Sequence, residues 1–195
     1  MMIRTLIASV AAIAIFAGLP TTSLAQDYKV AVANLIDSEI RGWSQSDEVI
    51  DAVRKQNEMS ASLSQDDVDN QDKKWRAETK GGSQNMINAV LSNSLSNYLK
   101  SVKTNSQGKY TEIFVMDMKG LNVGQSDITS DYWQGDEAKW KQSYGAGPDG
   151  VLIDEVEFDE STQTYQSQVS VAIVDPSTHK AIGAVTVGVN VEMLE

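Results

Sequence analysis

Apolar residues recur at every third or fourth position in the first half of the chain and at alternate positions in the second half. Between residues 27 and 57 a helical spacing connects Val30, Ala33, Ile36, Ile40, Trp43, Val49, Ile50 and Val53. Ser44 and Asp47 have the spacing of a helix-capping box, so a second helix could begin there. The pattern predicts one long amphipathic helix that bends near residues 44–46.

Two further helices follow in the pattern. Ser64 and Asp67 repeat the capping signal before a short helix over residues 68–78, which ends at the glycine pair 81–82. From Ser83 to residue 102 another helix is predicted, with an apolar stripe made of Met86, Ile87, Val90, Leu91, Leu95, Tyr98, Leu99 and Val102.

The period changes to two after residue 108, and five strands are predicted, at residues 110–117, 121–125, 151–158, 165–174 and 181–191. The last three are joined by short, turn-rich connections, which favour antiparallel neighbours. Helices in residues 27–103 followed by strands in residues 110–191 predict an α+β domain, in which the long N-terminal helix packs on a five-stranded antiparallel sheet. On the last two strands valines alternate with small and polar residues, so the second sheet face leaves room for another group.

Residues 126–144, which we call the lid segment, carry two of the four tryptophans and lie between predicted strands. A helix over residues 135–144 would place Trp133, Glu137, Trp140, Lys141 and Tyr144 on one side. Such an aromatic stripe can cover a small organic ligand, because its rings offer apolar area and a hydrogen-bonding edge. It can equally pack on the sheet beneath it, and the spacing alone does not distinguish the two.

Residues 1–25 have the features of a signal peptide. Arg4 precedes an apolar run over residues 5–19, and Ser23 and Ala25 are small residues at the positions read by a signal peptidase. We predict cleavage after Ala25, export to the periplasm, and a single domain over residues 26–195. An uncleaved segment that anchors the domain in the membrane is the alternative.

The amino-acid composition excludes several kinds of site and partner. There is no cysteine, which excludes disulfides, thiolate metal sites and cysteine nucleophiles. Loss of residues 1–25 removes one arginine and no acid, so the net charge of −11 becomes −12. This charge disfavours nucleic acid and anionic lipid as partners.

Catalytic groups are scarce. His179 is the only histidine and lies in a predicted turn, so a serine-histidine-acid triad is not expected. No metal site, no cofactor and no catalytic residue is predicted. Acid pairs such as Asp127 with Asp131, or Asp154 with Glu155, leave a carboxylate-dependent hydrolase as the less favoured alternative.

The sequence contains more side chains suited to ligand binding than to catalysis. Arg76, or Lys139 and Lys141 in the lid segment, could receive a ligand carboxylate. Asp127, Asp131 and Glu137 beside Tyr132, Trp133, Trp140 and Tyr144 are instead the components of an ammonium site. The sequence leaves open whether the ligand is an amine, an amino acid or an organic acid.

Several segments, in order along the chain, resemble the Cache family of extracytoplasmic PAS-like sensor domains. They are residues 46–53 (SDEVIDAV), 74–78 (KWRAE), 120–126 (GLNVGQS), 130–137 (SDYWQGDE) and 182–190 (IGAVTVGVN). The resemblance implies a PAS-like module with a long helix on one sheet face and a ligand pocket on the other, closed by loops after the second strand. Carried over by position, Asp131, Tyr132 and Trp133 would line this pocket, together with Asp154 and Tyr165.

The same resemblance implies a non-catalytic role in signal transduction. Family members bind amino acids, amines, small organic acids or purines and report to kinases or chemoreceptors. The arginine followed by aromatics that marks amino-acid binding in the family is absent before the lid segment. A membrane receptor or sensor kinase is the implied partner, and the long helix suggests a homodimer. A module that only docks on such a receptor, without a ligand, is the alternative.

Overall fold

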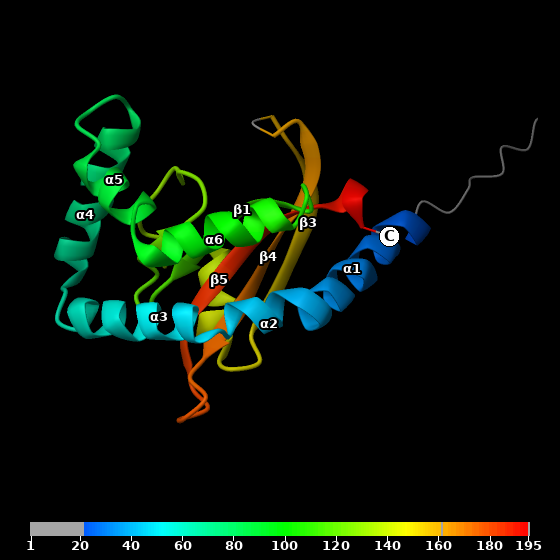
Figure 1. The fold of residues 1–195 in the computed structure, drawn as a ribbon, viewed down its shortest axis with the longest axis horizontal. Helices are drawn as coiled ribbons and strands as arrows, with labels where there is room; N and C mark the ends of the chain where they lie inside the picture. The colour runs from blue at the N-terminus through cyan, green and yellow to red at the C-terminus, as the bar shows by residue number, and fades with distance from the viewer. Residues whose placement is uncertain (1–21, 161, 195) are drawn as a thin grey trace, which may run out of the picture.

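The computed structural model describes residues 22–160 and 162–194, which form a layer of helices and one sheet (Figure 1). The helices are α1 (Thr22–Leu35), a π-helical turn (Ile36–Ile40), α2 (Arg41–Ser44), α3 (Asp47–Ser60), α4 (Gln65–Thr79), α5 (Asn85–Leu91), α6 (Ser94–Asn105) and α7 (Ala138–Lys141). The strands are β1 (Tyr110–Met116), β2 (Asn122–Gln125), β3 (Val151–Asp159), β4 (Thr164–Val174) and β5 (Ala181–Asn190). Short 3₁₀ helices cover Tyr144–Ala146 and Val191–Met193. The predicted signal peptide lies, up to residue 21, outside the described residues, and its cleavage stays a prediction.

The long N-terminal helix bends where the sequence predicted. α1, the π-helical turn and α2 run into one another, and α3 starts after Ser46, whose backbone is extended. The predicted capping box of Ser44 and Asp47 is wrong, because Ser46 is the N-cap residue and its side chain makes no capping hydrogen bond. Ser44 is instead fully buried.

Of the next two predicted helices, one begins as expected and the other is divided in two. The capping box of Ser64 and Asp67 is confirmed, since each side chain accepts a hydrogen bond from the other residue's backbone N–H. The single helix predicted from Ser83 is wrong. It divides into α5 and α6 because Asn93 caps a new helix, with its Oδ1 2.8 Å from the Ser96 backbone nitrogen. Asparagine competes with the helical backbone for such hydrogen bonds.

All neighbouring strands are antiparallel, in the order β2-β1-β5-β4-β3. β5 therefore lies at the centre of the sheet and β3 at one edge. The predicted α+β class, with helices packed on a five-stranded antiparallel sheet, is confirmed.

Alternation along the strands separates two faces. The main core joins valines of β4 and β5 to the long N-terminal helical segment and α6, which cross the sheet in Figure 1. Its fully buried members include Val32, Ile40, Val49, Val53, Leu99, Val169, Val171, Val185 and Val187. Complete burial of side chains of this size is worth about 1.5–3 kcal/mol each. This core fixes the helices on one face and leaves the opposite face of the sheet to the lid segment.

α4 and α5 lie beyond β2 at one end of the molecule (Figure 1). A second apolar cluster holds them there, made of Val68, Trp75, Ile87, Leu121 and Tyr132. In residues 22–160 and 162–194, no helix has the length and apolar character needed to cross a membrane.

Candidate ligand site on the second face of the sheet

The second face of the sheet has an apolar half and a polar half. In the apolar half, Phe114, Met116 and Ala184 form a cluster of their own, separate from the main core. In the polar half lie Glu112, Gln166, Gln168, Ser170, Thr186 and Gly188, which alternate with core residues along β1, β4 and β5.

The lid segment covers the apolar half. Trp140 and Tyr144 pack on the cluster of Phe114, Met116 and Ala184, and their ring centroids lie 5.0 Å apart. The Trp140 indole donates a hydrogen bond to the carbonyl oxygen of Asp117, at 3.1 Å. Here the rings pack directly on the sheet, the second of the two arrangements that the sequence left open.

The helix predicted for residues 135–144 is wrong. Only α7, four residues long, is α-helical, and Trp133 lies outside it in an isolated antiparallel bridge with Leu121. Backbone hydrogen bonds from Asn122 to Tyr132 and from Gln134 to Gly120 continue this pairing. The aromatic stripe is therefore divided, because residues 132–134 pair with the β1–β2 turn and residues 135–137 form a turn before α7.

The polar half is organised around Glu112. Its Oε1 accepts a hydrogen bond from the Gln168 amide at 2.9 Å, and no Lys or Arg nitrogen lies within ion-pair distance of it in the described residues. Burial raises the pKa of this carboxyl, the Lys139 ammonium acts against the rise, and the charges of Asp127 and Asp159 add to it. A partly buried carboxylate with a neutral partner is suited to receive a cation or a hydrogen-bond donor.

Lys139 approaches from the lid segment above. Its ammonium lies 5.4 Å from the centre of the Phe114 ring and 3.0 Å from the Glu137 carboxylate, and its side chain is only 17% exposed. Lys139 thus brings a positive charge to the boundary between the two halves.

Gly188 makes the closeness of these side chains possible. A Cβ at this position would lie 2.2 Å from the Thr111 hydroxyl and 3.0 Å from Cγ of Glu112. The Thr111 hydroxyl in turn donates to the Gln166 side-chain oxygen at 2.5 Å. Because position 188 has no side chain, Thr111, Glu112 and Gln166 can close over the central strand.

A pocket of about 150 Å³ opens beside this group. It is lined by Gln166 and Gln168 and by the acids of β3, namely Asp154, Glu155 and Glu157. Of the predicted site residues, Asp154 lines it. Its lining offers carboxylates and amides, and one of these carboxylates, Glu155, pairs with Lys29 of α1 at 2.7 Å.

Four predicted site residues come together elsewhere, as a connection between α4 and the lid segment. Arg76 lies 2.6 Å from both Asp72 and Asp131. The other oxygen of Asp72 accepts from the backbone nitrogens of Tyr132 and Trp133, at 2.9 and 3.1 Å. These contacts hold the lid segment in place.

The aromatic rings strengthen the same connection. Tyr132 stacks on Trp75 with centroids 5.5 Å apart, and burial raises the pKa of Tyr132 to about 12. The Trp75 indole donates to the carbonyl oxygen of Thr129 at 2.8 Å. Trp75 is fully buried, so α4 and the lid segment share one apolar contact.

The remaining predicted site residues, Asp127 and Tyr165, form no hydrogen bond or ion pair with Glu112 in the described part of the chain. Asp127 pairs with Lys103 on α6, at 2.6 Å, and affects Glu112 only through its charge. Tyr165 is half exposed and packs on Phe158.

The larger hollows in the described part of the chain include one of about 410 Å³ beside Lys103 and Asp127, and two more. One, of about 340 Å³, lies between α4 and the lid segment and is lined by Trp133 and Trp140 with Leu63, Val68 and Lys119 among others. Both indole nitrogens there already donate to backbone oxygens, so only ring faces remain available.

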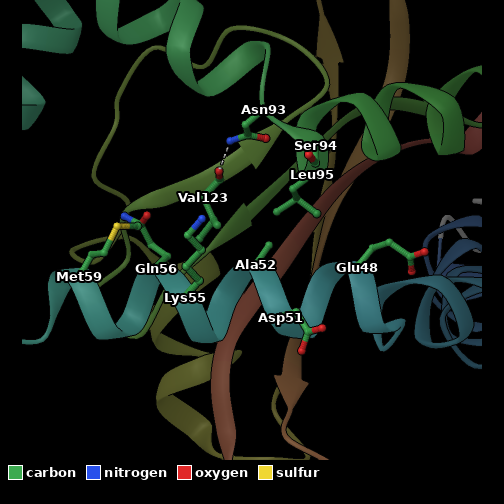
Figure 2. Close-up of a pocket in the computed structure, with 10 residues that line it drawn as sticks. All are labelled: Glu48, Asp51, Ala52, Lys55, Gln56, Met59, Asn93, Ser94, Leu95 and Val123. Carbon is green, nitrogen blue, oxygen red and sulfur yellow. Dashed lines mark hydrogen bonds between the residues drawn. The ribbon is translucent and has the colours of Figure 1, made fainter.

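The other hollow is a groove of about 440 Å³ on the helical side, between α3, the start of α6 and β2 (Figure 2). Its floor contains Ala52, Leu95 and Val123, and Lys55 and Gln56 extend over it while Asp51 points away. Across residues 22–160 and 162–194, no cluster of three His, Asp or Glu side chains could hold a metal ion.

The sequence reasoning missed Glu112, Gln168 and Gly188. The available signal was alternation, which places Glu112 on the same side of β1 as Phe114 and opposite Ile113. Glutamate in a strand otherwise indicates a solvent-facing position, so this signal was weak.

No family model and no curated protein matches this sequence. Several solved structures do resemble it. The sensor domain of the V. cholerae histidine kinase DctB shares 12% identity at a TM-score of 0.45, over 87% of this chain and 54% of that chain. The E. coli DcuS sensor domain shares 15% at 0.43, over 88% and 91%.

The sensory domain of the Campylobacter jejuni chemoreceptor Tlp3, with isoleucine bound, shares 15% identity at a TM-score of 0.37, over 90% of this chain and 64% of that chain. This chain thus spans about half the length of the first of the three structures. All three are sensor or sensory domains, one of a histidine kinase and one of a chemoreceptor, as the resemblance to Cache domains led us to expect. The likeness concerns the fold alone.

Proposed function

We propose that this chain is a single small-molecule-binding sensor module, exported to the periplasm, and that Glu112 receives an ammonium group of its ligand. The observation that carries the proposal is the partly buried Glu112 carboxylate, which has a neutral hydrogen-bond partner and no ion pair within the described residues. The neighbouring pocket adds two amides and three carboxylates, of which Glu155 is already paired with Lys29 of α1. An amine is favoured over a simple organic acid, because an anion would be repelled by these acids.

Binding without catalysis fits the groups at the site. The carboxylate, amides and hydroxyls there can orient a ligand through hydrogen bonds. The only histidine, His179, lies in the turn between β4 and β5 with a φ of 54°, on a different part of the chain. We propose that the ligand changes the contacts of Lys139 and so the position of the lid segment, which a receptor or kinase could read.

The test is ligand screening by thermal shift and calorimetry on the full chain, with amines, amino acids, organic acids and purines. A ligand at about 100 times its dissociation constant stabilises the folded state by about 2.7 kcal/mol. We expect an amine-bearing compound to stabilise the wild-type protein and to lose this effect in Glu112→Gln. Glu58→Gln, an exposed acid on α3, is the matched control and should bind normally.

The pH dependence gives a second readout. An ammonium ligand needs an ionised Glu112, so its affinity should fall as the pH drops through the raised pKa of this carboxyl. Glu112→Gln should remove that dependence. Equal binding to wild type and Glu112→Gln, or stabilisation by organic acids alone, would contradict the proposal. Mass spectrometry of the mature N-terminus tests the export signal separately.

A further inference from the structure

β3 leaves one side of the sheet open. It is the edge strand, and β4 is its one strand partner in residues 22–160 and 162–194. The register shifts between Ile153 and Val156, so a bulge interrupts the strand, and regular pairing with β4 continues from Val156 to Asp159. The last four residues of β3 therefore present a short run of backbone groups at the outer edge.

An exposed aromatic pair lies on this part of the strand. Phe158 and Tyr165 face each other across β3 and β4, with centroids 5.2 Å apart, and are 48% and 50% exposed. Figure 1 shows this hairpin rising beyond α6, away from the body of the protein. Two large rings that stay half exposed on a projecting hairpin offer apolar area to a partner.

The charged residues near Phe158 and Tyr165 in the sequence are all acidic. Five acids lie within residues 154–160, and no Lys or Arg occurs between residues 142 and 179. Glu155 pairs with Lys29 of α1 at 2.7 Å, whereas Glu157 and Glu160 have no ion pair within the described residues. Acids directly opposite one another are destabilising, so this edge disfavours a second copy of itself. A cationic partner is complementary to it.

We propose that the outer edge of β3 from Val156 to Asp159 is a docking site for an extended basic segment of another protein. The segment adds as a sixth strand beside β3. Its backbone pairs with the outer edge, and its Lys or Arg side chains meet Glu157 and Glu160. An apolar side chain of the segment packs on Phe158 and Tyr165. Strand addition of this kind takes its affinity from main-chain hydrogen bonds and its specificity from alternate side chains.

The test uses a short labelled peptide that alternates lysine and valine, with fluorescence anisotropy at physiological salt and the full chain. We expect the peptide to bind the wild-type protein and to bind the Phe158→Ser, Tyr165→Ser double variant at least about tenfold more weakly. The matched control is Met59→Ser with Ile128→Ser, which removes two exposed apolar side chains elsewhere and should leave binding unchanged.

A second peptide separates strand addition from charge attraction without changing the protein. It has the same sequence but is N-methylated at alternate residues, so it keeps its charge and loses the donors that pair with β3. We expect its binding to be lost. Equal binding of the two peptides, equal weakening in the two double variants, or no binding by either peptide would overturn the proposal. Binding that persists in Glu112→Gln shows that peptide docking does not depend on the carboxylate of the proposed ligand site.

Discussion

Arg76 of α4 and Asp131 of the lid segment form an ion pair between two parts of the chain that are far apart in sequence. Their Nη1 and Oδ1 atoms lie 2.6 Å apart, and Arg76 also contacts Asp72 on its own helix at 2.6 Å. Both carboxylates are largely buried, with side chains 12% and 15% exposed. The Arg76 guanidinium therefore balances the negative charges of two carboxylates at the place where the lid segment contacts α4.

Replacement of Arg76 by Met should destabilise the protein by about 1–2 kcal/mol, because the poorly solvated Asp72 loses a charged hydrogen bond and Asp131 loses its ion pair. Arg41→Met is the matched control, since Asp37, which is 77% exposed, is the one ion-pair partner of Arg41 among the described residues. Exposed pairs of this type contribute about 0.3–0.5 kcal/mol. Urea denaturation measures the free energy of unfolding of both variants. An equal decrease in the two would show that Arg76 does not hold the lid segment.

Ser64→Ala should cost about 1 kcal/mol, because it removes the side-chain half of the capping box of α4. Ser46 offers a matched control. It is the N-cap residue of α3 but makes no side-chain hydrogen bond, so Ser46→Ala should be close to neutral. Chemical denaturation compares the two. A cost for Ser46→Ala as large as that for Ser64→Ala would contradict the assignment.

Gly188→Ala should destabilise the protein by about 1–3 kcal/mol, since the new Cβ overlaps the Thr111 hydroxyl and presses on Glu112. The displaced carboxylate should also weaken amine binding. Gly42→Ala is the control, because a Cβ there meets nothing within 4 Å on a helix. That substitution should stabilise by about 0.4–1 kcal/mol. Calorimetry of both variants, with and without ligand, measures stability and amine binding. If Gly188→Ala left the stability unchanged, the predicted overlap of its Cβ with Thr111 would be wrong.

Stability in acid should depend on Asp175. Its carboxylate contacts Arg54 at 2.9 Å and accepts hydrogen bonds from Ser177 and Thr178, and these partners hold its pKa well below the usual range. A depressed folded-state pKa stabilises the fold above the unfolded value of about 3.9 and loses that contribution as the pH falls below it.

Asp175→Asn should therefore be less stable than wild type at neutral pH and lose less stability on acidification below about pH 4. Arg54→Met should flatten the same acid limb, and the double variant should add little to either single change, since the two residues act as a pair. Urea titrations across acid pH measure this. Parallel pH curves for wild type and Asp175→Asn would rule the linkage out.

The sequence by itself determined the type and order of the elements. Apolar spacings of three and four placed the helices, the change to a period of two after residue 108 placed the strands, and Ser64 with Asp67 marked the start of α4. These signals are local, because each depends on neighbours within one or two turns of the backbone. Even so, they failed where one residue competed with the pattern, as Asn93 did by capping α6.

Only the tertiary structure decided what the aromatic and acidic residues contact. Trp133 pairs with Leu121 instead of joining a helix, Tyr132 stacks on Trp75, and Arg76 compensates Asp131. None of these partners is set by spacing along the chain. Glu112, one of 27 acids, becomes distinctive because β1 turns it toward Gln168 and Lys139 on the side away from the core. A carboxylate acquires its chemistry from burial and from the charges around it, and both arise when distant segments meet.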